Sequence, residues 1–141
     1  MAGKIVLEVV TPEKQLLSQQ VDEVIAPGSE GEFGVLPGHC YFLSTLRIGE
    51  LRYRIGEHTH HMAVLWGYAE VTPTRVTIMA EIAEKAEDID INRAQAAVEQ
   101  AEQRLKAGGL PSEVHAAEMS LEKARLRKKI AERTLRSVHS A

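Results

Sequence analysis

The sequence contains little cysteine and few aromatic residues. Cys40 is the only cysteine in 141 residues, so no disulfide can form within the chain. One Trp, three Tyr and two Phe are too few for the stacking platforms on which single-stranded nucleic acids are held. The net charge of −3 does not favour a polyanion either. We therefore expect no nucleic acid partner.

Long hydrophobic runs are also missing. The longest apolar run in the middle of the chain extends only from Met62 to Trp66, whereas a membrane-spanning helix needs about 20 residues. The first residues enter a strand-like pattern at once, without the basic start and apolar core of a secretion signal. We expect a chain that does not cross a membrane, has no targeting segment and is located in the cytosol.

The residues that are present suffice for a folded protein. Apolar residues make up 44% and charged residues 26%, which is typical of globular chains. A length of 141 residues allows one ordinary domain, or a small domain with an appendage, but not two full-sized domains.

Up to about residue 81 the hydrophobic pattern has a period of two, which predicts strands with one buried face. Between residues 50 and 55, Leu51 and Tyr53 face one way, whereas Glu50, Arg52 and Arg54 face the other. The segments 5–9 and 76–80 alternate in the same manner, so their apolar residues are predicted to lie in the core.

Turn residues recur between these segments at short intervals. We assign turns to Gly56 and Gly67, among others, and place His58, His60 and His61 in a hairpin turn. Many short strands at regular spacing predict an antiparallel sandwich or barrel.

From about Asp90 the period becomes that of a helix. Five apolar residues with spacings of three and four form one stripe: Ile91, Ala94, Val98, Ala101 and Leu105. A second stripe contains Val114, Ala117, Leu121, Ala124, Lys128, Ala131, Leu135 and Val138. Gly108 and Gly109 are expected to end the first helix, with Ser112 as cap of the second. The prediction is an antiparallel helical hairpin whose alanine-rich contact buries little area.

Charge divides the chain as well. Residues 81–102 carry seven acids and two bases, whereas residues 123–136 carry seven bases and one acid. The basic side chains either form a solvated face paired with the acidic first helix or are directed at an acidic partner protein.

The segment GSEGEFGVLPGH, residues 28–39, is the strongest candidate site. It lacks the Gly-Lys-Ser/Thr ending of a phosphate loop, and Glu30 and Glu32 would repel phosphate. The spacing of its Glu and His residues and of the adjoining Cys40 matches no metal-ligand pattern. An acid–base pair of Glu32 and His39 remains open, but no nucleophile or cofactor motif accompanies it. A docking loop fits these residues best.

With these parts in order, the chain resembles the epsilon subunit of bacterial rotary ATP synthase. The resemblance covers nearly all residues and is most specific in GSEGEFGVLPGH and in IDINRA, residues 89–94, which has the family's Ile/Leu-Asp-x-x-Arg-Ala motif. It implies an α+β chain: a ten-stranded β-sandwich that binds the rotor, residues 1–86, followed by a regulatory helical hairpin, residues 87–141. It also implies a non-catalytic subunit without a required cofactor or metal.

The resemblance implies docking of the sandwich to the gamma subunit and to the ring of c subunits. The residues that would make this contact are Ser29, Glu30, Glu32 and His39. For His39 the alternative is a structural role in the turn at Pro37 and Gly38.

The resemblance further implies that the hairpin inhibits ATP hydrolysis by contacting the beta, and also the alpha, subunits. The basic residues that match this role are Lys123, Arg125, Arg127, Lys128, Lys129 and Arg133.

Some family members bind ATP in the folded hairpin. The matching positions are Glu84, Asp90, Arg93, Ala94 and Arg127, but Gln100 and Lys123 replace arginines, so only weak regulatory ATP binding is expected. The alternative for IDINRA is helix initiation with Asp90 as cap.

The implied location is the cytoplasmic side of the bacterial plasma membrane, reached only through the complex. The sequence leaves open whether protons or sodium ions drive the motor, how strong inhibition is and which hairpin conformation prevails. Two rival hypotheses are a free-standing β-sandwich enzyme using Glu32 and His39, and a coiled-coil adaptor.

Overall fold

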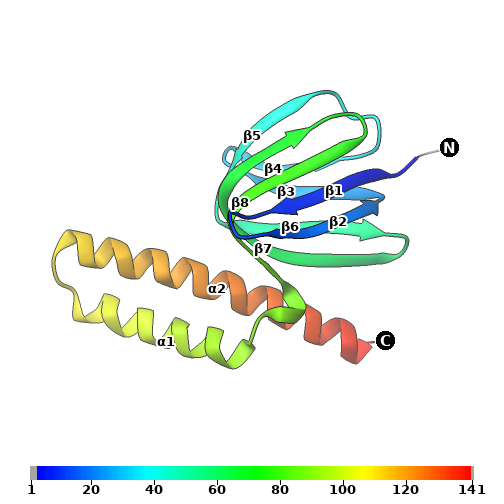
Figure 1. Cartoon of the computed structure of the whole chain (residues 1–141). Coiled ribbons are helices and arrows are strands. Elements are labelled where there is room, and N and C mark those ends of the chain that lie inside the picture. The colour runs from blue at the N-terminus through cyan, green and yellow to red at the C-terminus, as the bar shows by residue number, and fades with distance from the viewer. Residues whose placement is uncertain (1–2, 141) are drawn as a thin grey trace. The chain divides into compact units, whose positions relative to one another are not determined.

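The structure, a computed structural model, describes the backbone of residues 3–140 and the side chains of residues 3–133. The chain divides into two compact units, Met1–Lys85 and Ala86–Ala141. The first unit consists of strands and the second of helices (Figure 1).

The first unit is a β-sandwich, as predicted. Within the described residues its strands are β1 (Ile5–Val10), β2 (Gln15–Val21), β3 (Glu23–Gly28), β4 (Gly31–Val35), β5 (Phe42–Leu46), β6 (Gly49–Ile55), β7 (His58–Val71) and β8 (Arg75–Lys85). The order is β2-β1-β8-β7-β5-β3-β4, and β6 pairs with β3 and β7. All pairings are antiparallel except that of β1 with β8, which is parallel.

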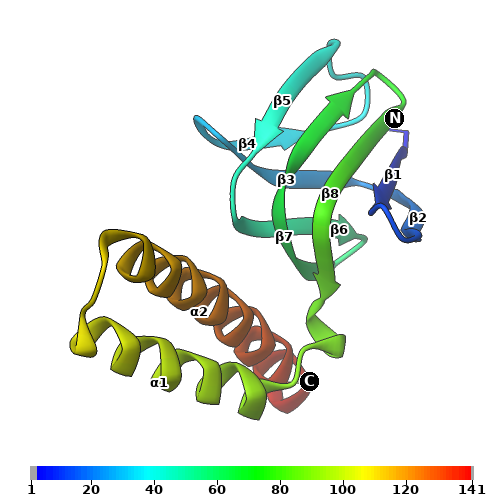
Figure 2. The ribbon, with the colours of Figure 1, turned by 60° about the vertical axis from the view of Figure 1, so that its left-hand side comes forward.

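The described residues form eight strands, not the expected ten, because β7 and β8 are long. β7 pairs with β6 through Val64 and with β5 from Gly67 onward, while β8 follows it along both halves. One continuous strand therefore serves both parts of the sandwich (Figure 2).

The backbone of β7 is irregular where it changes partner. Trp66 has a φ of 52° and Gly67 a φ of 146°. The assignment of a turn to Gly67 is wrong, because the residue lies inside the strand. His58, His60 and His61 also belong to β7, and the preceding turn is at residues 56–57. A glycine inside a strand often marks such a distortion rather than a turn.

The core contains the residues that the alternating pattern predicts. Ile5, Leu7 and Val9 of β1 are fully buried, and so are the predicted positions of β6 and β8: Leu51, Tyr53, Val76, Ile78 and Ala80 are each at most 7% exposed. Glu50 differs from the prediction, since it is buried at 6% exposure. Alternation defines the face on which a side chain lies, but not whether that face is covered.

The second unit begins with the short helix η1 (Ala86–Asp88), followed by α1 (Ile91–Ala107) and α2 (Pro111–Ser140). α1 and α2 pack as an antiparallel hairpin (Figure 2). Neither helix, in the part the structure describes, combines the length and apolar character needed to span a bilayer.

The ends of the helices follow known capping rules. Asp90 caps α1 by accepting hydrogen bonds from the N–H groups of Asn92 and Arg93, and Gly108 ends it with a φ of 71°. Ser112 is not the cap of α2. The Leu110 carbonyl accepts from the N–H groups of residues 113 and 114, and Pro111 occupies the first helical position, where its fixed φ suits a helix start.

The contact between the helices is thin. Val98 and Ala101 of α1 pack with Leu121 and Ala124 of α2, and Leu105 lies at the edge. Among the other stripe residues, Ala94, Ala117 and Ala131 are buried and Lys128 is half-buried. Ile130 is fully buried although the stripe omitted it. The side chains of Leu135 and Val138 lie outside the described residues.

Candidate functional site

The turn between β3 and β4 is attached to β5. The Ser29 N–H donates to the Thr45 carbonyl at 2.9 Å, and the two hydroxyl oxygens lie 2.6 Å apart. Gly28 leaves room for this tight turn, since a Cβ there would lie 2.7 Å from the Gly31 carbonyl oxygen. Glu30 is exposed at the tip of the turn. The glycines therefore place Ser29 and Glu30 at a fixed position beside β5.

His39 closes a second turn and packs on β5. Its N–H donates to the Leu36 carbonyl at 3.1 Å, around Pro37 and Gly38, and Gly38 has a φ of 85°. This is a type II turn. The His39 ring lies 6.3 Å from the Phe42 ring, and its Nδ1 is 2.8 Å from the Cys40 carbonyl oxygen. The backbone of His39 thus serves the turn while its ring forms part of the surface.

Glu32 belongs to a different group of side chains. Its Oε1 accepts from Arg52 Nη2 at 3.2 Å. The next residue, Phe33, projects from the other face of β4 and packs edge-on against Phe42, with ring centroids 5.1 Å apart. Glu32 and His39 therefore have separate partners, which gives no support to an acid–base pair.

Exposed apolar side chains lie beside these turns, and the sequence reading did not select them. Leu43, Tyr68 and Met79 are 68%, 55% and 39% exposed. Tyr68 pairs with Met79 in the sheet and with Thr45, two residues along β5 from Leu43, so all three share one face. We call these three residues the apolar face. Three consecutive apolar residues at positions 41–43 were the available signal, since a strand with one buried face cannot bury them all.

A shallow apolar depression adjoins this face. It holds about 350 Å³ and is lined by Tyr68 and Met79, together with Val10, Thr11 and Pro12 at the end of β1. An exposed apolar surface of this kind is typical of a protein–protein contact.

The opposite part of the sandwich carries a network of ion pairs. Asp22 accepts a hydrogen bond from Lys4 Nζ at 2.6 Å and another from the Gly56 N–H at 2.7 Å. The Lys4 hydrogen bond, followed by that of Gly56, lowers the pKa of Asp22 below its usual 3.8. Arg54 lies 3.8 Å from Asp22 and 3.7 Å from Glu23.

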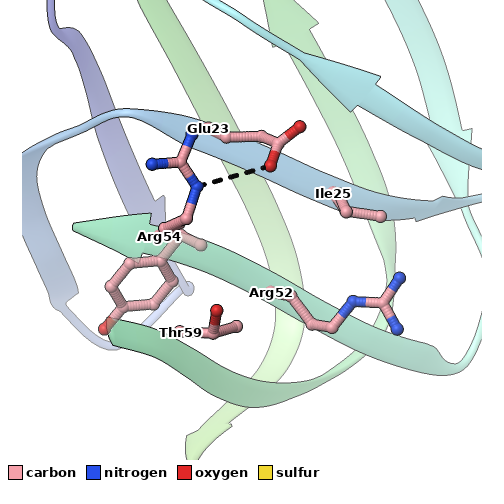
Figure 3. A pocket seen from close by; sticks show the side chains of 6 residues that line it. Glu23, Ile25, Arg52, Arg54 and Thr59 are labelled. Atoms are coloured by element: carbon pink, nitrogen blue, oxygen red, sulfur yellow. Dashed lines mark ion pairs between the residues drawn. The ribbon is translucent and has the colours of Figure 1, made fainter. Parts of the chain in front are cut away.

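Figure 3 shows the small pocket next to this network, which holds about 200 Å³ between β3, β6 and β7. Arg52 and Arg54 line it from the same face of β6, and their guanidinium groups point in different directions. Arg54 faces Glu23, whereas Arg52 extends toward the other end of the strand.

The candidate inhibitory residues lie on α2 with different exposure. Arg125 and Lys129 are exposed, and the other four, Lys123, Arg127, Lys128 and Arg133, are half-buried. Arg125 pairs with Glu102 of α1 at 3.6 Å, as expected if basic residues of α2 pair with the acidic helix. An exposed pair of this kind contributes at most about 1 kcal/mol.

A groove between α1 and α2 contains part of the candidate nucleotide site. Gln100, Arg104, Lys123 and Arg127 line it, together with Ser120 and three alanines, and it holds about 240 Å³. Of the five candidate nucleotide residues, only Arg127 lines this groove. Asp90 is the cap that precedes α1, and the backbone N–H groups of Arg93 and Ala94, in the first turn, donate to it. Glu84 belongs to β8.

Metal chemistry has no visible basis in the part of the chain that the structure describes. No three side chains of His, Cys, Asp or Glu converge there as ligands of an ion would.

Each of the two units matches a known protein domain. Residues 4–86 match the family model of the ATP synthase delta/epsilon chain beta-sandwich domain, and residues 87–139 match that of its long alpha-helix domain. The chain therefore belongs to the delta/epsilon chain family of ATP synthases.

Comparison with individual relatives narrows the family assignment to epsilon chains. The chain is 55% identical to the ATP synthase epsilon chain of Syntrophobacter fumaroxidans, over 95% of its own length and 100% of the relative's. It is 50% identical to that of Citrifermentans bemidjiense, over 96% and 99% of the two chains. The resemblance to the epsilon subunit is thereby confirmed.

Two solved structures of ATP synthases contain chains similar to this one. A chain in the Euglena gracilis mitochondrial ATP synthase, solved as OSCP/F1/c-ring, aligns with a TM-score of 0.78 and 25% identity, over 89% of this chain and 79% of that one. A chain of the Tetrahymena thermophila central stalk and c-ring aligns with a TM-score of 0.59 over 92% and 98%; at 16% identity it supports the fold alone.

Proposed function

We propose that this epsilon-type subunit of the central stalk transmits rotation of a proton-driven c-ring through gamma to the catalytic head, and that its hairpin inhibits ATP hydrolysis. The subunit itself has no catalytic role in this proposal. It resides on the cytoplasmic side of the bacterial plasma membrane and is held there by its partners.

The observation that carries the docking part is the apolar face together with the turns beside it. Leu43, Tyr68 and Met79 offer apolar area for a permanent partner such as gamma, because burial of such area drives stable association. Glu30 and Glu32 offer exposed carboxylates for polar loops of the c-ring. Ser29 and His39 fix these turns against β5.

The inhibitory part is supported by the hairpin. The six basic residues of α2 can meet an acidic surface of the beta and alpha subunits once the helices separate. The alanine-rich contact lowers the free energy needed to separate α1 from α2, since alanine buries far less apolar area than leucine.

The groove between the helices favours a second role, weak binding of regulatory ATP. Arg104, Lys123 and Arg127 line it and offer positive charge to phosphates. The absence of an arginine at Gln100 is expected to lower affinity by about tenfold or more, equivalent to roughly 1.5–3 kcal/mol.

Recovery of the full chain with its partners tests the docking part. Tagged Tyr68→Lys should retain much less gamma from detergent-solubilised membranes, because a charge would lie in the apolar contact. Glu57→Lys, at the exposed turn after β6, is the matched control and should retain gamma normally. Equal recovery by the two variants would contradict the proposed surface, whereas loss of all rotor subunits by the unmodified chain would contradict the proposed function.

A further inference from the structure

Glu50, Arg52 and Glu32 form a chain of contacts from the buried part of β6 to the exposed edge of β4. The Glu50 side chain is 5% exposed, and its Oε1 lies 3.2 Å from Arg52 Nη1. The other guanidinium nitrogen, Nη2, lies 3.2 Å from Glu32 Oε1. His61 Nδ1 is 3.4 Å from the second carboxylate oxygen of Glu50.

This arrangement fixes the direction of the arginine. A buried carboxylate must be compensated by a close positive partner, so Glu50 holds one edge of the Arg52 guanidinium. The guanidinium is planar and rigid, so the contacts of Nη1 with Glu50 and of Nη2 with Glu32 together restrict its orientation. Arg52 is itself 25% exposed, so its orientation is restrained by protein contacts more than that of a surface arginine.

Of the three residues Glu50, Arg52 and Glu32, Glu32 is the exposed one, with 46% of its side chain accessible. Its contact with Arg52 uses Oε1, and a carboxylate has about four lone-pair sites on two oxygens. Oε2 therefore remains able to accept a hydrogen bond from another molecule. Because Arg52 holds Oε1, the directions in which Oε2 can point are restricted.

We propose that Glu50 and Arg52 are positioning residues that hold the Glu32 carboxylate for a cationic side chain on a polar loop of the c-ring. The inference rests on the proposed docking function, and it adds the mechanism by which one docking carboxylate is oriented. The positioning role gives a reason for the burial of Glu50 on β6, where the alternating pattern predicts an exposed side chain.

The alternation of β6 supplies a matched control. Arg54 lies on the same face two residues away, and its ion pairs are with Asp22 and Glu23 and not with Glu32 (Figure 3). Arg52→Lys keeps the positive charge beside Glu50 but cannot contact two carboxylates through a planar fork. Arg54→Lys makes the same chemical change outside the proposed chain of contacts.

The experiment measures binding of the full-length chain to the purified rotor of gamma and c-ring in detergent, by biolayer interferometry. Glu32→Gln and Arg52→Lys should each weaken binding about fivefold, because each removes or misdirects one partly exposed ionic contact. Arg52→Lys in the Glu32→Gln background should have no further effect. Arg54→Lys should bind like the unmodified chain.

Three other results would contradict the positioning role of Arg52, the docking role of Glu32, or both. If Arg52→Lys binds normally while Glu32→Gln binds weakly, the positioning role is wrong and the docking role of Glu32 stands. If the two losses multiply in the double variant, Arg52 acts independently of Glu32. If Glu32→Gln binds normally, both the docking role and the positioning role of this group are wrong.

A second readout does not depend on the partner. The carboxyl ¹³C resonance of Glu32 in the free chain should move in Arg52→Lys and stay in Arg54→Lys. An unchanged resonance in Arg52→Lys would overturn the proposal, whatever the melting temperatures of the variants.

Discussion

Single residues of the sandwich determine how its long strand can bend. Gly67 adopts a φ of 146° at the point where β7 exchanges β6 for β5, and a Cβ there would lie 1.9 Å from the Met79 carbonyl oxygen. A side chain at this position would therefore require the backbone of β8 to move. The requirement is imposed by the neighbouring strand as well as by φ itself.

Gly67→Ala is expected to destabilise the protein by about 3 kcal/mol, because it combines strained φ with a backbone clash. Gly34→Ala is the control, since a Cβ there meets nothing within 4 Å, and it should change stability by less than about 0.5 kcal/mol. Urea unfolding of both variants measures the difference. Equal stability of the two variants would contradict the proposed clash.

Asp22 should contribute a pH-dependent part of stability. The hydrogen bonds from Lys4 and Gly56 lower its pKa in the folded state. A carboxyl with a lowered folded pKa stabilises the protein above its unfolded pKa, and this contribution disappears as pH falls through the folded value. The unmodified chain should lose it between about pH 5 and pH 2.

Asp22→Asn should flatten this part of the acid-unfolding profile, because the amide does not titrate. The measurement is the urea midpoint at several pH values over the same window. Parallel profiles for Asp22→Asn and the unmodified chain would show that Asp22 is not responsible.

At the scale of elements, the two helices of the hairpin differ from the strands in how they are held. The strands bury large branched side chains, whereas the helices meet mainly through alanines, with Val98 and Leu121 as the larger contacts. Caps at both ends of α1 compensate in part, because they satisfy backbone groups that the contact cannot. A hairpin of this kind is suited to exchange between two states that differ by a few kcal/mol.

The cap of α1 offers a test of the two interpretations of IDINRA. Asp90→Ala should destabilise the hairpin by about 1 kcal/mol and speed amide exchange at residues 92 and 93. Asp90→Asn keeps a good capping side chain and should exchange like the unmodified chain. Calorimetric titration with Mg-free ATP then separates the roles: weaker binding by Asp90→Asn indicates a nucleotide contact, and equal binding indicates a cap alone.

At the scale of the whole molecule, the chain divides into two compact units, and the proposed docking and the proposed regulation fall on different units. Among the described residues, the sandwich has a core cluster of its own that is made of strand residues such as Leu7, Leu51 and Ile78. A chain without the hairpin should therefore still fold. This makes removal of the hairpin an interpretable change in an assembled complex.

A chain ending at Glu87 should raise the ATPase activity of the assembled complex, because the basic residues of α2 are then missing. The measurement is ATP hydrolysis by complexes reconstituted with the short and the full chain, with gamma content as control for docking. Unchanged activity at equal gamma content would contradict the inhibitory role and leave docking intact.

The sequence by itself determined the type of each unit and most of the core. Alternation identified Leu7, Leu51 and Ile78 as buried, and the helical period with Gly108 identified α1 and its end. These features depend on local periodicity and backbone preference, which are determined by residues close together in the sequence. The turns proposed for docking were likewise visible as glycine-rich loops.

Only the tertiary structure decided which surfaces are covered and which distant side chains meet. Glu50 is buried, Glu32 is paired with Arg52 from another strand, and Leu43, Tyr68 and Met79 gather on one exposed face because β5, β7 and β8 are neighbours. The physical reason is that strand order, and not strand pattern, sets these contacts, and strand order depends on pairing between segments far apart in the chain.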